Sequence, residues 1–292
     1  MATTGELSRE RLFDVEGKVA LVTGGSGIGL MIAQALAANG AKVYICGRSK
    51  DKLDRASETH GKDARGDIIS LQGDITTKKD IASLYDEMKS REEYVSILVN
   101  NAGISGETFP VTENKSAEDW KKSLFDNEKA TFEDWVDVYR TNVAATYFTT
   151  VAMLPLLQAC TERHPGWSAT VINVTSISGL VKTSQHHFSY NASKAAAIHI
   201  TRMLASDIAA TGLKIRVNSI APGVFPSEMT AGESDKAQKS KLETEKYQGK
   251  VPANRPGNDD DMASAVLFTA GNQYLNGQTI TVDGGYTLAA GL

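Results

Sequence analysis

The sequence is poor in the residues that disulfide-stabilised domains and metal centres require. Its 292 residues include 2 cysteines, Cys46 and Cys160, which permit at most one bridge. Its 5 histidines have no cysteine or carboxylate partners at the spacing of metal ligands. The composition therefore favours a reducing compartment and predicts no metal site.

The sequence also lacks an excess of basic charge and a membrane-like opening segment. Its 31 Lys and Arg against 35 Asp and Glu give a net charge of −4, so nucleic acid is not an expected partner. Acidic residues at positions 6, 10, 14 and 16 are unlike a signal peptide, and we expect a cytoplasmic location. The uncharged stretch 141–160 contains polar side chains and Pro155, which favours a helix covered by the sheet and a second subunit over a membrane span.

Short β-branched runs alternate with segments of helical periodicity along the chain. Expected strands cover residues 19–22, 42–45, 68–72, 97–100, 170–174, 215–220 and 279–282. Expected helices cover residues 28–38, 79–89, 132–157, 190–210 and 262–269. Apolar runs of this kind predict one α/β domain over residues 1–292, a doubly wound Rossmann-type fold with a seven-stranded parallel sheet.

Two segments interrupt this alternation, residues 106–130 and 224–254. Both are charged, the second most densely from Glu228 onward, and both suit either a solvated surface segment or a mobile lid over a substrate cleft. We interpret the first as an insertion and the second, called the lid segment below, as a substrate lid. Weakly similar stretches at 116–120 and 131–135 predict two helix starts.

A glycine-rich turn follows the first expected strand and leads into a helix. It reads Thr23-Gly24-Gly25-Ser26-Gly27-Ile28-Gly29. Glycines permit positive φ and let backbone amides approach a diphosphate, which a helix N-terminus stabilises. A turn of this kind is weak evidence by itself, because glycine turns also serve structure alone.

The second expected strand ends at Gly47-Arg48, where a dinucleotide site meets the adenosine ribose. A carboxylate there would bind the 2′-hydroxyl of NAD, whereas the guanidinium of Arg48 suits the 2′-phosphate of NADPH and NADP⁺. Polar groups also follow the third and fourth strands, at Asp74 and at Asn100. Each could be an ordinary turn residue, but together these strand ends outline one crevice.

A tyrosine and a lysine four positions apart, Tyr190 and Lys194, open the helix after the fifth strand. This spacing places both side chains on one helix face, with Cβ atoms roughly 5–6 Å apart. An ammonium beside a phenol favours the phenolate, which would bring the pKa of the tyrosine nearer to neutrality. Tyr190 then acts as general acid towards a carbonyl oxygen, and Ser176 at the strand end holds that oxygen.

These motifs resemble the short-chain dehydrogenase/reductase family, from about Leu12 to Tyr286. The resemblance implies catalytic roles for Ser176, Tyr190 and Lys194, and adds Asn142, which supports the lysine and a water-linked proton relay. It also implies an oligomer, a homodimer or homotetramer, from the closing Val282-Asp283-Gly284-Gly285. Within the family the chain is most similar to 3-oxoacyl-thioester reductases of the rhamnolipid type.

The same resemblance implies a set of cofactor contacts. Asp74 and Ile75 lie by the adenine, and Lys194 binds the nicotinamide ribose beside Tyr190. The full implied set is Gly24, Ser26, Gly27, Ile28, Gly29, Arg48, Asp74, Ile75, Asn100, Ala102, Gly103, Tyr190, Lys194, Pro222, Gly223 and Ser227. The glycine turn is one residue shorter than the family pattern, which puts the cofactor affinity in question.

The sequence thus predicts an NADPH-dependent oxidoreductase that reduces a ketone or 3-oxo group of a small-molecule carbonyl substrate to a secondary alcohol. The alternative is a catalytically silent NADP-binding sensor or scaffold protein. The shortened glycine turn favours this alternative, whereas the complete catalytic set favours an enzyme, because binding alone does not require it. A dehydration or epimerisation on the same scaffold is a third possibility. His186 and His187 precede Tyr190 and could touch substrate, but adjacent side chains need not share a face, and the sequence favours a surface loop for them.

Overall fold

The computed structural model describes residues 4–292 and contains one seven-stranded, all-parallel sheet in the order β3-β2-β1-β4-β5-β6-β7. The fold class predicted from the alternating runs is confirmed, and the largest difference at a strand end is two residues. The strands are β1 (Val19–Thr23), β2 (Lys42–Gly47), β3 (Asp67–Gln72), β4 (Ile97–Asn100), β5 (Thr170–Val174), β6 (Arg216–Pro222) and β7 (Thr279–Val282). Strand order reverses between β1 and β4, which is where ligands bind in sheets of this type.

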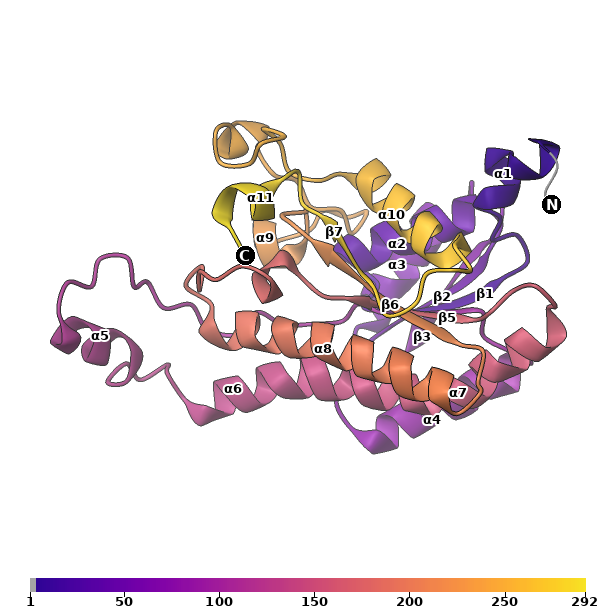
Figure 1. Ribbon diagram of the computed structural model, residues 1–292, viewed down its shortest axis with the longest axis horizontal. Coiled ribbons are helices and arrows are strands. Elements are labelled where there is room, and N and C mark those ends of the chain that lie inside the picture. Colours follow the sequence, from indigo (N-terminus) through magenta and orange to yellow (C-terminus); the bar gives the residue numbers. More distant parts are fainter. Residues whose placement is uncertain (1–3) are drawn as a thin grey trace.

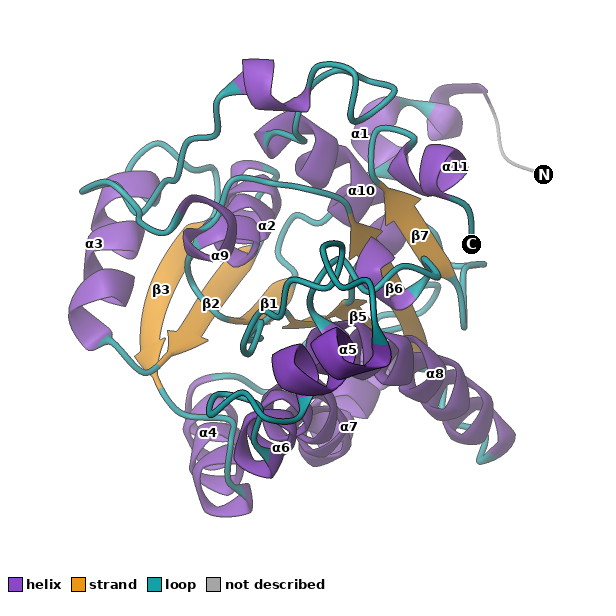
Figure 2. Ribbon diagram, turned by 90° about the vertical axis from the view of Figure 1, so that its left-hand side faces the viewer, coloured by secondary structure: helices purple, strands orange, loops and turns teal. Residues whose placement is uncertain are grey.

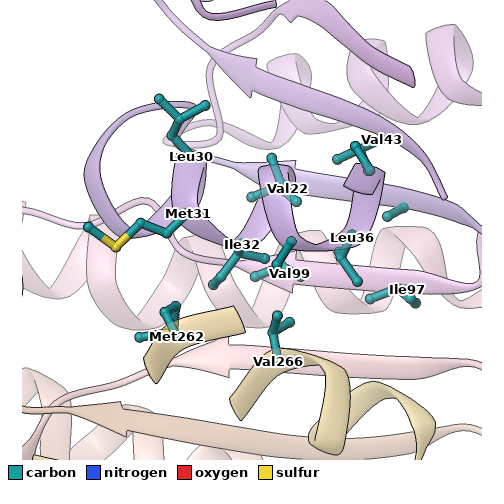
Figure 3. Close-up of a cluster of buried hydrophobic side chains, with 14 of the residues drawn as sticks. Val22, Leu30, Met31, Ile32, Leu36, Val43, Ile97, Val99, Met262 and Val266 are labelled. Carbon is teal, nitrogen blue, oxygen red and sulfur yellow. The ribbon is translucent and has the colours of Figure 1, made fainter. Parts of the chain in front are cut away.

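Helices cover both faces of the sheet, as its doubly apolar strands require (Figure 1). One face carries α2 (Gly27–Ala38), α3 (Lys50–His60) and α10 (Asp259–Gly271). The other carries α4 (Lys78–Arg91), α7 (Ala145–Arg163) and α8 (Phe188–Ala210). Side chains of α2 and α10 meet over the strands at the first face (Figure 3), including Leu30, Ile32, Leu36, Met262 and Val266.

The helix predicted over residues 132–157 runs on to Arg163 in three parts. These are α6 (Phe132–Tyr139), a π-helical turn η2 (Arg140–Ala144), and α7, which contains Pro155. By length and composition it could cross a membrane, with a mean hydropathy of 1.4 over its most apolar window, of which 44% is buried. Buried core helices pass the same test, and α7 packs Met153 and Leu157 into the core beside β4 and β5.

Shorter elements lie around the edge of the sheet. They are η1 (Thr4–Leu7), α1 (Arg9–Leu12), α5 (Ala117–Leu124), η3 (Ile177–Gly179), α9 (Glu228–Ala231), η4 (Thr244–Tyr247) and α11 (Tyr286–Ala290). The two predicted helix starts are confirmed, since the side chains of Ser116 and Thr131 accept amide hydrogen bonds at the beginnings of α5 and α6. Residues around α5 project from the body of the molecule (Figure 1).

Candidate active site

A cavity of about 660 Å³ opens along the carboxyl ends of β1 to β5. It brings together most of the cofactor contacts that the sequence predicts: Gly24, Ser26, Gly27, Ile28, Arg48, Asp74, Ile75, Ala102, Gly103, Tyr190, Lys194 and Ser227. Gly29, Asn100, Pro222 and Gly223 lie outside its wall, as do Asn142 and Ser176 of the catalytic set. The cavity thus extends from the end of β2 to the start of α8.

The glycine turn leaves no room for side chains. Gly24 has φ +81°, and a Cβ there would lie 2.7 Å from Nδ2 of Asn101. A Cβ on Gly29 would lie 1.8 Å from the carbonyl oxygen of Gly24, so Gly29 lets α2 begin directly behind the turn. The amide of Gly24 also donates to the carbonyl of Cys46 at 2.7 Å. The shortened turn is therefore a tightly packed one with its backbone along the cavity.

Asn101 holds this turn, and the sequence reasoning did not single it out. Its Nδ2 donates to the carbonyls of Thr23 and Gly24 at 3.0 and 3.1 Å. The neighbouring Asn100 points the other way, into the interior, where its Nδ2 donates to Thr150 at 2.9 Å and to Asn173 at 2.8 Å. The doubled asparagine was the available signal, because successive residues of a strand face opposite sides.

The end of β2 carries a cation, Arg48, whose charge contributes to lowering the pKa of Asp74 in the same cavity wall. Gly47, Arg48 and Ser49 line the cavity, and no salt bridge to Arg48 is found among residues 4–292. Lys52, in the first turn of α3, lines the same part of the wall. Two positive side chains at this end suit a phosphate ester more than a ribose hydroxyl.

Tyr190 and Lys194 lie at the other end of the cavity, on the first turns of α8. The Nζ atom of Lys194 is 5.6 Å from the centroid of the Tyr190 ring and donates to the carbonyl of Val174 at 3.0 Å. Burial raises the pKa of Tyr190, and a hydrogen bond with Ser176 acts in the opposite direction. Burial also lowers the pKa of Lys194 to about 8.

This corrects one expectation, since the sequence predicts a tyrosine pKa moved towards neutrality. In the structure, removal of the phenol from water outweighs any help from the ammonium, which is itself poorly hydrated. Tyr190 is thereby held in its protonated form at neutral pH. That form is the one a proton donor needs.

Asn142 lies in the π-helical turn and joins two parts of the site. Its Oδ1 accepts from the amide of Ile104 at 2.9 Å, and its Nδ2 donates to Oγ of Ser193 at 3.0 Å. Ser193 is next to Lys194, and a Cβ on Gly103 would lie 3.0 Å from Oδ1 of Asn142. The π turn, a feature common at functional sites, thus fixes the chain after β4 against α8.

Beside Tyr190, residues 177–188 contact two other segments, the insertion and α11. Gln185 and His186 have positive φ values of 49° and 69°, which is strained for residues other than glycine. His186 accepts at its carbonyl from the amide of Phe109 at 2.8 Å, in the insertion. Gln185 accepts from Ser178 at 2.6 Å and donates to the hydroxyl of Tyr286, on α11, at 3.0 Å.

The structure places His186 and His187 in a turn beside Tyr190 that agrees with the loop expected from the sequence, and neither side chain lines the cavity. Both are partly buried, and the His187 ring centroid is 6.2 Å from that of Tyr190. Burial lowers the pKa of His187 and so favours a neutral imidazole. The contact between this turn and the insertion could not be predicted from local sequence, because Phe109 and His186 are far apart along the chain.

Comparison with known proteins gives consistent results. The family model described as short chain dehydrogenase matches residues 18–238. The short-chain dehydrogenase/reductase PhomF of Diaporthe leptostromiformis is 39% identical over 290 residues, which cover 97% of this chain and 95% of that protein. The rhamnolipids biosynthesis 3-oxoacyl-acyl-carrier-protein reductase of Pseudomonas aeruginosa is 33% identical over 280 residues, covering 94% and 98%.

The same group appears among solved structures. The RhlG/NADP active-site complex of Pseudomonas aeruginosa superposes with a TM-score of 0.76 at 30% identity, covering 94% of this chain and 98% of that one. These matches confirm the family predicted from the motifs and its similarity to 3-oxoacyl reductases of the rhamnolipid type.

Proposed function

Since the chain belongs to the short-chain dehydrogenase/reductase family and is thereby an oxidoreductase, we propose that it reduces a ketone or 3-oxo group to a secondary alcohol with NADPH. One observation carries the proposal: Tyr190 and Lys194 occupy one end of the cavity and Arg48 the other. A group that transfers a proton and a group that binds a phosphate ester are thus placed along one elongated ligand site.

The residues present fit a dinucleotide. The glycine turn would hold its diphosphate, and Asp74 with Ile75 would hold its adenine. Ala102 and Gly103 would lie along the cofactor towards the nicotinamide ribose, and Arg48 would hold the 2′-phosphate. The bound cofactor supplies the hydride. The complex of the similar Pseudomonas aeruginosa structure with NADP supports this choice of cofactor.

The protein supplies the proton and the orientation of the substrate. Tyr190, whose pKa is raised by burial, keeps its proton until negative charge develops on the carbonyl oxygen, and then donates it. Ser176 hydrogen-bonds that oxygen. Lys194 stands behind the tyrosine, and its ammonium donates to the carbonyl of Val174. From this position it would hold the nicotinamide ribose of the cofactor.

The test is an NADPH-oxidation screen over ketones, quinones and 3-oxoacyl thioesters, made with the native protein and the Tyr190→Phe variant. The variant is expected to bind cofactor normally and to lose roughly 10²–10⁴-fold in turnover, because only the transferable proton is removed. Unchanged turnover in the variant would remove Tyr190 from the mechanism. A native protein that binds NADPH and turns over no carbonyl compound would favour the sensor alternative.

We also propose that the protein is a cytoplasmic homodimer or homotetramer. Tyr147, Phe148 and Val151 of α7 and Met203 of α8 are between 38% and 49% exposed, on the faces of these helices that point away from the sheet. A second copy would cover them. Sedimentation velocity on the native protein and on Phe148→Glu checks this, since the charge should lower the assembled fraction; a native monomer contradicts the proposal.

The proposed cytoplasmic location is supported by the cysteines. Both are free and buried, which suits a reducing compartment.

A further inference from the structure

An ion pair crosses the proposed cofactor cavity. Nζ of Lys52, on α3, is 2.8 Å from Oε1 of Glu228, the first residue of α9 and part of the lid segment. Both residues line the cavity, and their side chains are 47% and 35% exposed. Figure 2 shows α3 and α9 as neighbours above the side of the sheet that holds β2 and β3.

This pair differs from the other ion pairs of residues 4–292. Only one other pair, Asp137 with Arg140, has both partners in the cavity wall, and it lies within one helical segment. Lys52 and Glu228 are 176 residues apart in sequence and connect two separate elements. Glu228 also accepts from the hydroxyl of Ser234 at 2.7 Å, so the pair anchors the beginning of the lid segment.

The position of Lys52 relates it to the proposed 2′-phosphate. It follows Arg48 by four positions, and Ser49, the residue preceding α3, lines the cavity between them. A phosphate monoester carries a charge of about −1.5 to −2 at pH 7 and forms strong hydrogen bonds with ammonium groups. An exposed ion pair between side chains is worth only about 0–1 kcal/mol. A phosphate at Arg48 would therefore compete successfully for Lys52.

We propose that Lys52 exchanges Glu228 for the 2′-phosphate when NADPH binds, so that Lys52 is a second specificity-determining residue and Glu228 its competitor. The proposal rests on the proposed use of NADPH. NADH has no group that can draw Lys52 away, so it leaves the Lys52–Glu228 pair intact. The cofactor with the 2′-phosphate thereby releases the beginning of the lid segment, and the cofactor without it does not.

Two probes isolate the 2′-phosphate: adenosine 2′,5′-bisphosphate and adenosine 5′-monophosphate, titrated calorimetrically into the full chain at low salt. The exchange predicts effects of opposite sign. Lys52→Ala should weaken bisphosphate binding about tenfold, and Glu228→Gln should tighten it about threefold to tenfold. Neither should change monophosphate binding more than about twofold. Lys50→Ala is the matched control, because it removes the same charge from the same helix outside the cavity wall, beside Asp54.

A double variant separates the exchange from simple repulsion of the phosphate by Glu228. The tightening caused by Glu228→Gln should disappear when Lys52 is already alanine. If it persists in full, or if Lys52→Ala weakens both probes equally, the exchange is wrong. If Arg48→Ala weakens the bisphosphate while the Lys52 and Glu228 variants do not alter it, only this inference fails. If the native protein binds both probes equally, the NADPH proposal fails with it.

Discussion

The two sides of the cavity are built by different means. On the cofactor side, residues 24–29, 47–49, 73–76 and 101–103 continue directly from parallel strands, and the sheet fixes their backbone. On the substrate side, residues 104–131 and 177–188 are largely irregular and hold each other through hydrogen bonds between distant positions, such as the amide of Phe109 with the carbonyl of His186. Local sequence therefore determines the first side, and tertiary contacts determine the second.

Chemistry and selectivity divide along the same line. Tyr190 and Lys194 belong to a regular helix, and Gly24 and Arg48 belong to strand ends. The segments that border Tyr190 on the open side are the strained Gln185–His186 turn and the insertion. We infer that the regular elements of the fold position the proton donor and the cofactor-binding residues, and that the irregular segments determine which carbonyl substrate is accepted.

The largest effect is expected from a methyl group placed behind the glycine turn. Gly29→Ala puts a Cβ 1.8 Å from the carbonyl oxygen of Gly24, so the turn or α2 must move. We expect a loss of about 1–3 kcal/mol or more in stability. Losing two amide contacts to a diphosphate, at roughly 1.5–3 kcal/mol each, also weakens NADPH binding roughly a hundredfold or more.

Gly47→Ala is the control for this prediction, because its Cβ would meet only Leu53 at 3.6 Å, an ordinary contact. Urea unfolding and calorimetric titration with NADPH measure both effects. If the two alanine variants behave alike, the turn yields more easily than its packing indicates, and the cofactor side is not the rigid one.

The next largest effect tests the charge at the end of β2. Arg48→Ala should weaken NADPH roughly tenfold to a hundredfold and NADH far less, because a charge-assisted hydrogen bond contributes about 1.5–3 kcal/mol. Gly47→Asp should move the preference towards NADH, since a carboxylate repels the phosphate and accepts from the ribose. The ratio of kcat/KM for the two cofactors, with added salt as a second variable, measures this. A native ratio near one would leave Arg48 an ordinary surface residue.

Features that depend on local sequence were predicted correctly, whereas features that depend on tertiary contacts were not. The strands, the helix starts and the Tyr190–Lys194 pair depend on neighbours in sequence, and sequence patterns predicted them. The opposite orientations of Asn100 and Asn101 were not distinguished, because β4 is short and apolar on both faces, so no alternation marks its sides. The raised pKa of Tyr190 was missed for a related reason: burial is a property of the whole fold.

The smallest expected effect concerns the substrate side, where Asp134 connects the insertion to the catalytic helix. Its Oδ1 accepts from the amide of Glu107 at 2.9 Å, and its Oδ2 accepts from the hydroxyl of Ser189, next to Tyr190, at 3.1 Å. Asp134→Ala removes both contacts and frees the beginning of the insertion. Because no cofactor contact changes, NADPH affinity should stay within about twofold of the native value, while KM for the carbonyl substrate rises about threefold to tenfold.

Glu133→Ala is the matched control, since it removes the adjacent carboxylate from the same first turn of α6. It accounts for the loss of negative charge near the helix N-terminus, which lowers helix stability by itself. Steady-state kinetics with the best carbonyl substrate, together with NADPH titration, gives both quantities for each variant. If Asp134→Ala lowers kcat and leaves KM unchanged, Asp134 positions Tyr190 through Ser189 and the insertion does not shape the substrate site. If it weakens NADPH as much as it weakens the substrate, the two sides of the cavity are coupled and the division between them is wrong.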